Sequence, residues 1–178
     1  MRKQFIAAFA LVAVTSASTS IHAQNFGSFK AGISELSINS EVVLEKEADA
    51  VRYPISQSDS RIVLKESEEE HFALGKVALS KATVILYYTK PQGQAPLGKI
   101  SIATFSSSGK KIASEAIGVF ADFAGMHFNT SIRFLAQDKG AVAVTSDVTA
   151  LKDNGEVNSS MSKTSTYYVT SKGKILKQ

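Results

Sequence analysis

The dominant pattern along the chain is a series of short apolar runs rich in Val, Ile, Thr, Tyr and Phe, separated by clusters of Gly, Ser, Asp, Asn and Lys. Such runs are typical of β-strands bounded by turns. We expect strands at residues 33–38, 42–45, 51–55, 61–65, 72–79, 83–89, 99–105, 128–135, 141–150, 164–170 and 174–176. The sequence therefore predicts a mainly β fold of antiparallel sheets, forming a sandwich or a barrel-like sheet with one or two short helices.

Three tight turns support the antiparallel arrangement. They contain Gly at Ser108–Lys110, Asp153–Gly155 and Lys172–Lys174, and the second also contains Asn154. Gly and Asn tolerate the positive φ angles that hairpin turns require. Each turn therefore predicts that the strands on either side of it are hydrogen-bonded neighbours.

Two segments fit both helix and strand. Between Lys110 and Met126, apolar residues recur at helical spacing, although residues 117–121 also alternate as in a strand. We predict a helix here, even though Gly118 costs about 1 kcal/mol inside a helix. Residues 41–51 are a second, weaker helix candidate that overlaps two predicted strands.

The run 141–150 shows a change of face. Val142 and Val144 share one face, whereas Asp147 and Thr149 fall on the other. One extra residue in a strand inverts its side-chain alternation. The pattern therefore predicts a β-bulge near Thr145 or Ser146.

The closing strands also suggest an alternative architecture. From Phe128 onward, the runs 140–144 and 167–169 alternate with the turns 153–155 and 173–175. This succession loosely resembles the closing strand meander of nuclear-transport-factor-2-like domains, over less than a third of the chain. The resemblance implies an α+β fold in which long helices precede a curved sheet, and it assigns no active-site residue.

The amino terminus has the three parts of a secretory signal peptide. Arg2 and Lys3 precede a ten-residue apolar run that ends at Val14, and small polar residues follow. As a helix this run rises only about 15 Å, roughly half of a membrane's hydrocarbon core, so a membrane anchor is the weaker interpretation. We expect cleavage after Ala23, or alternatively after Ala17. Residues 1–23 are then the signal peptide, and residues 24–178 form a single mainly β domain.

The absence of cysteine limits the cellular locations and the kinds of site that we expect for this protein. The chain contains no cysteine, which excludes disulfides, thiolate metal sites and a bacterial lipobox. The style of the leader is bacterial. We therefore expect a periplasmic or secreted protein without a lipid anchor, and without a transmembrane segment in the mature chain.

Charge is small but unevenly distributed. Without Arg2 and Lys3, basic residues exceed acidic ones by two. Residues 24–80 carry 6 basic and 10 acidic side chains, and residues 81–178 carry 12 and 6. We hypothesise a weak contact between an anionic surface and lysines near turns, namely Lys110, Lys111, Lys172 and Lys174. Nucleic acid is not expected as a partner, because the net charge is low and no aromatic residues interleave the lysines.

Two histidines remain in residues 24–178 as candidates for chemistry. His71 follows Glu68–Glu70, but successive side chains diverge, so we interpret this stretch as a solvated acidic turn and predict no metal site. His127 lies among aromatic residues with Asp122 five positions earlier. Such a pair could serve as a general base and its orienting carboxylate.

No known catalytic or phosphate-binding motif accompanies these histidines. We therefore predict an exported, non-enzymatic β domain that binds a partner protein or a small ligand and has no cofactor. The alternatives are a small hydrolase-like cleft enzyme using Asp122 and His127, and a structural or adhesive surface subunit.

Overall fold

The computed structural model describes residues 26–66, 69–92, 97–123, 126–152 and 154–178. The predicted signal peptide lies outside these residues. The strands are β1 (Glu41–Leu44), β2 (Pro54–Ile55), β3 (His71–Ala78), β4 (Ala82–Thr89), β5 (Gly98–Ser106), β6 (Lys111–Phe123), β7 (Met126–Gln137), β8 (Ala141–Leu151), β9 (Lys163–Val169) and β10 (Ile175–Lys177). The helical elements are residues 26–31, α2 (Glu47–Ala50), α3 (Gln57–Asp59), the π-helical η1 (Ser60–Leu64) and the 3-10 turn η2 (Asp138–Gly140).

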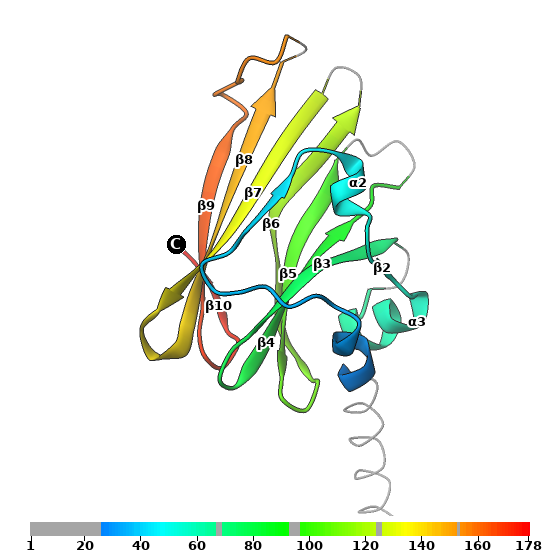
Figure 1. Ribbon diagram of the computed structural model, residues 1–178, viewed down its shortest axis with the longest axis vertical. Helices are drawn as coiled ribbons and strands as arrows, with labels where there is room; N and C mark the ends of the chain where they lie inside the picture. Colours follow the sequence, from blue (N-terminus) through cyan, green and yellow to red (C-terminus); the bar gives the residue numbers. More distant parts are fainter. Residues whose placement is uncertain (1–25, 67–68, 93–96, 124–125, 153) are drawn as a thin grey trace, which may run out of the picture.

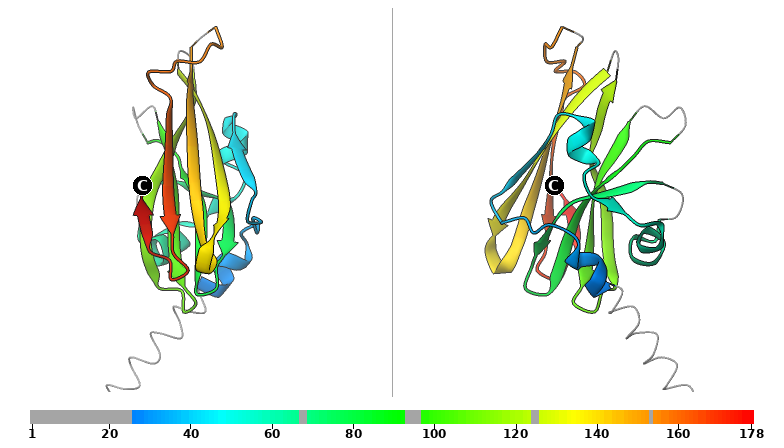
Figure 2. Two further views of the ribbon diagram at one scale, coloured as in Figure 1. Left: turned by 90° about the vertical axis from the view of Figure 1, so that its left-hand side faces the viewer. Right: turned by 45° about the vertical axis from the view of Figure 1, so that its right-hand side comes forward.

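All ten strands belong to one antiparallel sheet with the order β10-β9-β8-β7-β6-β5-β4-β3-β2, and β1 pairs with β7. β6 pairs with β5 over most of its length but with β7 only at residues 121–123. Beyond that hairpin β1 takes the place of β6 beside β7, at residues 130–133. The sheet is therefore divided into a β2–β6 half and a second half of β1 and β7–β10, which diverge from their shared hairpin (Figures 1 and 2).

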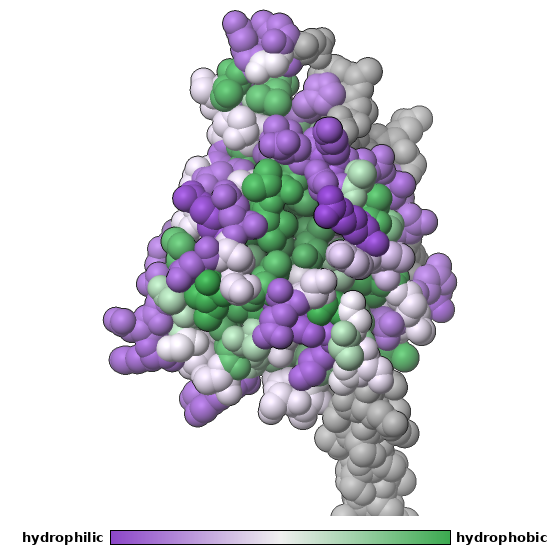
Figure 3. All heavy atoms as spheres, in the orientation of Figure 1, coloured by the Kyte–Doolittle hydropathy of each residue, from purple (hydrophilic) through white to green (hydrophobic). Residues whose placement is uncertain are grey.

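An inner core fills the space between the two halves. The β2–β6 half contributes Val84, Leu86, Tyr88, Ile100 and Ile102, and the other half contributes Ile132, Phe134, Val142 and Val144. Hydrophobic side chains also gather on the surface near the middle of the face seen in Figure 1 (Figure 3). Their position agrees with an inner core that comes close to the surface at the opening between the halves.

An outer core covers the opposite face of the β2–β6 half. Phe26, Phe29 and Ile33 from the amino-terminal segment, with Val63 and Leu64 of η1, pack against Ile85, Tyr87, Ala103 and Phe105. The alternate residues of β4 and β5 thus face two different cores. This explains why both strands have nearly continuous apolar sequences, since a strand buried on both faces cannot show polar alternation.

Close approach between the halves depends on Gly118. A Cβ atom at this position would lie 2.9 Å from Oγ of Ser146 and 3.2 Å from Cγ2 of Thr130. The Thr130 hydroxyl donates a hydrogen bond to the carbonyl of Val119 at 2.5 Å. A residue that is unfavourable in a helix therefore has a steric role in a strand.

The mainly β, antiparallel prediction is confirmed, and eight of the predicted strands correspond to β1, β3, β4, β5, β7, β8, β9 and β10. The turns at 108–110 and 172–174 join β5 to β6 and β9 to β10. Asn154 and Gly155 also lie in a turn, while Asp153 is outside the described residues. The α+β alternative is not supported, because every helix in the described residues is short.

The helix predicted for residues 110–126 is wrong. Residues 111–123 form β6, because pairing with β5 supplies backbone hydrogen bonds along most of the segment. Residues 41–51, the weaker candidate, are divided between β1 and the short helix α2. Helical spacing of apolar residues was misleading here, since Ile117, Phe120 and Ala121 are buried at the place where the strand leaves one half of the sheet for the other.

Four further predictions are corrected. Residues 61–65 lie mostly in η1, and residues 33–38 form no strand, making a single bridge from Glu35 to Lys76. Residues 51–55 contain only the two-residue β2. The predicted bulge is absent, because β8 keeps one register with both neighbours from residue 142 to 148. Ser146 is fully buried and faces the core opposite Gly118, so the alternation continues through a small polar residue.

Candidate functional site

A pocket lies at the edge of the β2–β6 half, and we call it the His71 pocket. Its volume is about 520 Å³, within the range of roughly 300–1,000 Å³ typical of small-ligand sites. It is lined by Pro54, Ile55, Gln57, Ser60, Glu69, Glu70, His71, Phe72 and Gln92. Most of these residues are polar, and Pro54, Ile55 and Phe72 supply the apolar part of the lining.

Strand register explains the position of His71. It is the first residue of β3 and pairs with Ile55 of β2 on one side and Thr89 of β4 on the other. Its side chain is completely buried. The interpretation of this stretch as a solvated acidic turn is therefore wrong for His71.

Glu66 reaches the same place by a different route. Ser56 begins α3 by accepting a hydrogen bond from the backbone N–H of Asp59 at 3.1 Å. η1 follows and ends at Lys65, whose left-handed backbone (φ 59°) reverses the chain. The backbone N–H of Glu66 then donates to the carbonyl of Ser60 at 3.0 Å. This turn directs Glu66 back towards the sheet.

The two ring nitrogens of His71 have different surroundings. Nδ1 lies 3.0 Å from Oγ1 of Thr89, within hydrogen-bonding distance. Nε2 is buried without a hydrogen-bond partner and lies 3.5 Å from Oε2 of Glu66. Burial lowers the pKa of His71 and outweighs the opposite effect of Glu66 and Glu69. The imidazole is therefore neutral at pH 7.

The other oxygen of Glu66 is held by two donors. The Tyr87 hydroxyl donates to Oε1 at 2.9 Å, and Nζ of Lys111 lies 3.5 Å from the same oxygen. Burial and the Glu66 charge raise the pKa of Tyr87, so its hydroxyl stays protonated as a donor. The Lys111 amine is anchored by the carbonyl of Leu64 at 2.6 Å. These contacts fix Oε1 and leave Oε2 facing His71.

Glu69 completes the cluster. One ligand-type atom from each of Glu66, Glu69 and His71 lies within 4.8 Å of the other two. Glu69 also forms an ion pair with Lys99 at 3.5 Å, between side chains that are 39% and 59% exposed. Two carboxylates and a neutral imidazole therefore converge beside the pocket, although we expected the side chains of Glu69 and His71 to diverge from the sequence alone.

The alternative catalytic pair lies elsewhere. Asp122 and His127 are opposite each other in the register of β6 and β7, next to their hairpin. His127 is half-buried, and the Asp122 side chain is outside the described residues. His127 does not line the His71 pocket. The hypothesis of a catalytic pair stays a prediction.

The four candidate lysines are not equivalent. Lys110, Lys172 and Lys174 are exposed in two turns at the same end of the sheet (Figure 1). Lys111 instead directs its amine to Leu64 and Glu66. A contact with an anionic surface would therefore depend on Lys110, Lys172 and Lys174. Lys111 instead supports Glu66 beside His71.

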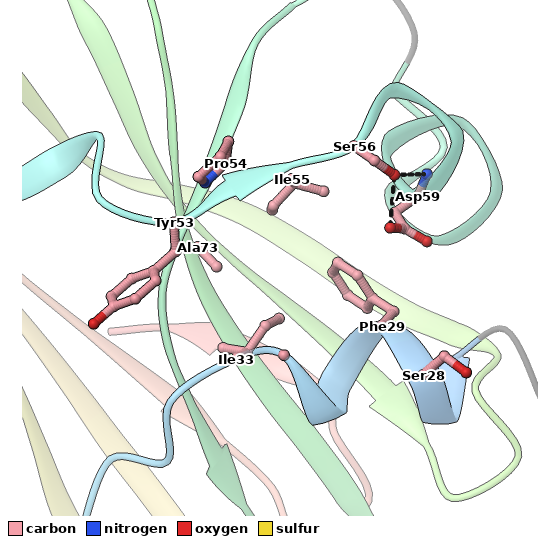
Figure 4. A pocket seen from close by; sticks show the side chains of 10 residues that line it. Ser28, Phe29, Ile33, Tyr53, Pro54, Ile55, Ser56, Asp59 and Ala73 are labelled. Atoms are coloured by element: carbon pink, nitrogen blue, oxygen red, sulfur yellow. Dashed lines mark hydrogen bonds between the residues drawn. The ribbon is translucent and has the colours of Figure 1, made fainter.

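A smaller pocket of about 270 Å³ lies between residues 26–33 and β2, against Phe29, Ile33 and Ile55 (Figure 4). Its polar wall is formed by Ser56 and Asp59, which are hydrogen-bonded to each other at 2.7 Å. These groups satisfy one another. This pocket therefore offers a ligand fewer polar groups without a hydrogen-bond partner than the His71 pocket does.

Comparison with known proteins adds no functional information, because no family model, curated protein or solved structure matches this chain. Within the described residues, no helix has the length and apolar character needed to cross a membrane.

Proposed function

We propose that the protein is an exported, non-enzymatic β domain that binds a small ligand in the His71 pocket. One observation carries the proposal: the pocket joins a buried imidazole, whose Nε2 has no hydrogen-bond partner, to the carboxylate of Glu69. Ile55 and Phe72 supply apolar surface beside them. Ligand sites combine apolar surface with convergent polar groups, and this pocket has both, with the polar groups in the majority.

Energetics favour a bound partner for His71. A buried polar atom without a hydrogen bond costs about 1–3 kcal/mol. A ligand that meets Nε2 recovers this cost and fills the pocket at the same time. The proposal therefore explains why Nε2 of His71 is buried without a hydrogen-bond partner.

A binding role is favoured over catalysis by the position of Thr89. Its hydroxyl is the group nearest to Nδ1 of His71, so it would be the candidate nucleophile. Unlike His71, Thr89 is not among the residues that line the pocket. A substrate in the pocket would not reach this hydroxyl.

The test compares two tryptophan variants on the same helical turn. Gln57 lines the pocket and Ser58 does not, and both are exposed. The probe is a library of small organic fragments in the presence of EDTA, followed by protein-observed NMR. We expect hits to shift the backbone signals of Ile55, His71 and Phe72. Binding should weaken at least tenfold in Gln57→Trp and stay unchanged in Ser58→Trp.

Two results would overturn the proposal. One is a library in which no fragment shifts the signals of the pocket. The other is equal binding by Gln57→Trp and the unmodified protein, since a tryptophan at position 57 would obstruct this pocket.

A further inference from the structure

We infer that Glu66, Glu69 and His71 bind a divalent transition-metal ion of the zinc class beside the His71 pocket. This inference rests on the proposed function, because the ion would be held by His71 and Glu69, which also line the pocket. The sequence alone predicted no metal site. The structure brings together Glu66, which follows the left-handed turn at Lys65, Glu69, and His71 at the start of β3.

The spacing of the ligand atoms fits such an ion. Zinc binds imidazole nitrogen and carboxylate oxygen at about 2.0–2.2 Å in tetrahedral geometry, which places ligand atoms roughly 3.3–3.5 Å apart. Nε2 of His71 and Oε2 of Glu66 are 3.5 Å apart. This pair can therefore form one edge of the tetrahedron. Glu69, within 4.8 Å of both, reaches the third position with a small side-chain movement.

The unpartnered nitrogen is the independent observation that points to a ligand. Nε2 is completely buried, has no hydrogen-bond partner and faces a carboxylate oxygen. If Nδ1 donates to Thr89, Nε2 presents a lone pair to another acceptor, and a cation between the two removes the repulsion. Metal-bound histidines commonly have the other ring nitrogen hydrogen-bonded in this way, which fixes the ring.

The surroundings of Glu66 resemble the supporting shell of a metal ligand. Tyr87 and Lys111 both approach Oε1, so Oε2 is left for the ion. Lys111 is anchored to the carbonyl of Leu64 and does not occupy the proposed metal position. Hydrogen bonds to a ligating carboxylate orient it and tune its affinity.

Lys99 is the principal competitor for Glu69. Its ion pair with Glu69 is exposed, and exposed pairs of this kind contribute little to stability. An ion held by two carboxylates and an imidazole would displace Lys99 at small cost. Because His71 and Glu69 both line the pocket, a fourth position is available to water or to a further ligand.

The ligand set also indicates the class of metal. Calcium and magnesium prefer sites made of oxygen atoms. Imidazole together with carboxylates suits zinc, copper, nickel or iron. We therefore choose Zn²⁺ as the binding probe and Co²⁺ as its spectroscopic substitute.

The experiment measures Zn²⁺ binding by isothermal titration calorimetry, using protein expressed from the full-length sequence and freed of metal with EDTA. We expect one saturable site, at least tenfold weaker binding in Glu69→Gln, and no site in His71→Gln. Glu70→Gln is the matched control, since Glu70 is the neighbouring carboxylate outside the cluster. Co²⁺ should give the visible absorption of a tetrahedral or five-coordinate nitrogen and oxygen site, and Zn²⁺ should abolish it.

Absence of saturable binding would overturn the inference, and so would equal weakening in Glu69→Gln and Glu70→Gln. If His71→Gln fails to fold, the Glu69→Gln comparison and the Co²⁺ spectrum decide. Fragment binding in EDTA separates the two proposals. Fragments that bind without any Zn²⁺ site would overturn the metal inference and support the pocket, and Zn²⁺ binding without fragment binding would do the opposite.

Discussion

Replacing Gly98 with alanine should destabilise the protein through a single steric conflict. A Cβ atom at position 98 would lie 2.2 Å from Cε2 and 2.4 Å from the hydroxyl oxygen of Tyr88. The ring cannot easily move, since Tyr88 is 3% exposed and packs edge-on against Phe120 at 6.0 Å between centroids. Overpacking of this kind costs about 1–3 kcal/mol.

A double-mutant cycle isolates the conflict. Tyr88→Ala alone removes a buried aromatic ring and should cost about 3–5 kcal/mol. In the Tyr88→Ala protein the new Cβ of Gly98→Ala meets no ring, so the second substitution should leave the free energy of unfolding nearly unchanged. The coupling energy between the two substitutions should be about 2 kcal/mol. Gly27→Ala is the control, because a Cβ at position 27 meets no atom within 4 Å.

The assay is urea unfolding followed by far-ultraviolet circular dichroism, with the free energy of unfolding obtained by linear extrapolation. Strictly additive effects of Gly98→Ala and Tyr88→Ala would refute the steric explanation. So would a Gly98→Ala protein that is as stable as Gly27→Ala.

Three further outcomes follow from the structure and the leader. Burial raises the pKa of Tyr88 to about 12. The contribution of the protonated Tyr88 to the free energy of unfolding should therefore be complete below pH 10 and be lost as the pH rises towards 12. Urea unfolding curves and tyrosinate absorbance measured across this pH range check this expectation. Hydrogen bonds from Thr164 and Arg133 lower the pKa of Asp147, so Asp147→Asn should cost about 0.5–1 kcal/mol at pH 7, and its difference from the unmodified protein should vanish as pH falls through the carboxyl pKa. Export predicts that protein recovered from the source's envelope or medium begins at Gln24 or close to it, and intact mass showing retained residues 1–23 would contradict it.

Local sequence patterns were sufficient for most of the strands. The strands on either side of Gly109 and Gly173 could be predicted because glycine favours hairpin turns. β4, β5 and β8 could be predicted because their sequences are rich in β-branched residues. β6 was mistaken for a helix because its apolar positions serve two different pairings along one strand. Ser146 was mistaken for a bulge because a small polar residue in a core is justified only by its distant neighbour Gly118.

The candidate site could not be read from the sequence for a similar reason. In the sequence, His71 directly follows Glu68–Glu70, and successive side chains point in different directions. Glu66 lies close to His71 in space because the left-handed turn at Lys65 reverses the chain. The supporting residues Tyr87 and Thr89 come from a neighbouring strand, so their positions depend on register. An unmatched buried nitrogen becomes visible only in three dimensions.

The most direct test of the account is NMR of the imidazole nitrogens while Zn²⁺, or the strongest fragment hit, is added. His71 and His127 represent the two competing sites, and His22 adds a third signal set in protein that retains residues 1–23. Assignment by His71→Gln and His127→Gln identifies them. We expect a large shift of Nε2 of His71 with little change at His127. A shift at His127 with His71 unchanged would contradict it.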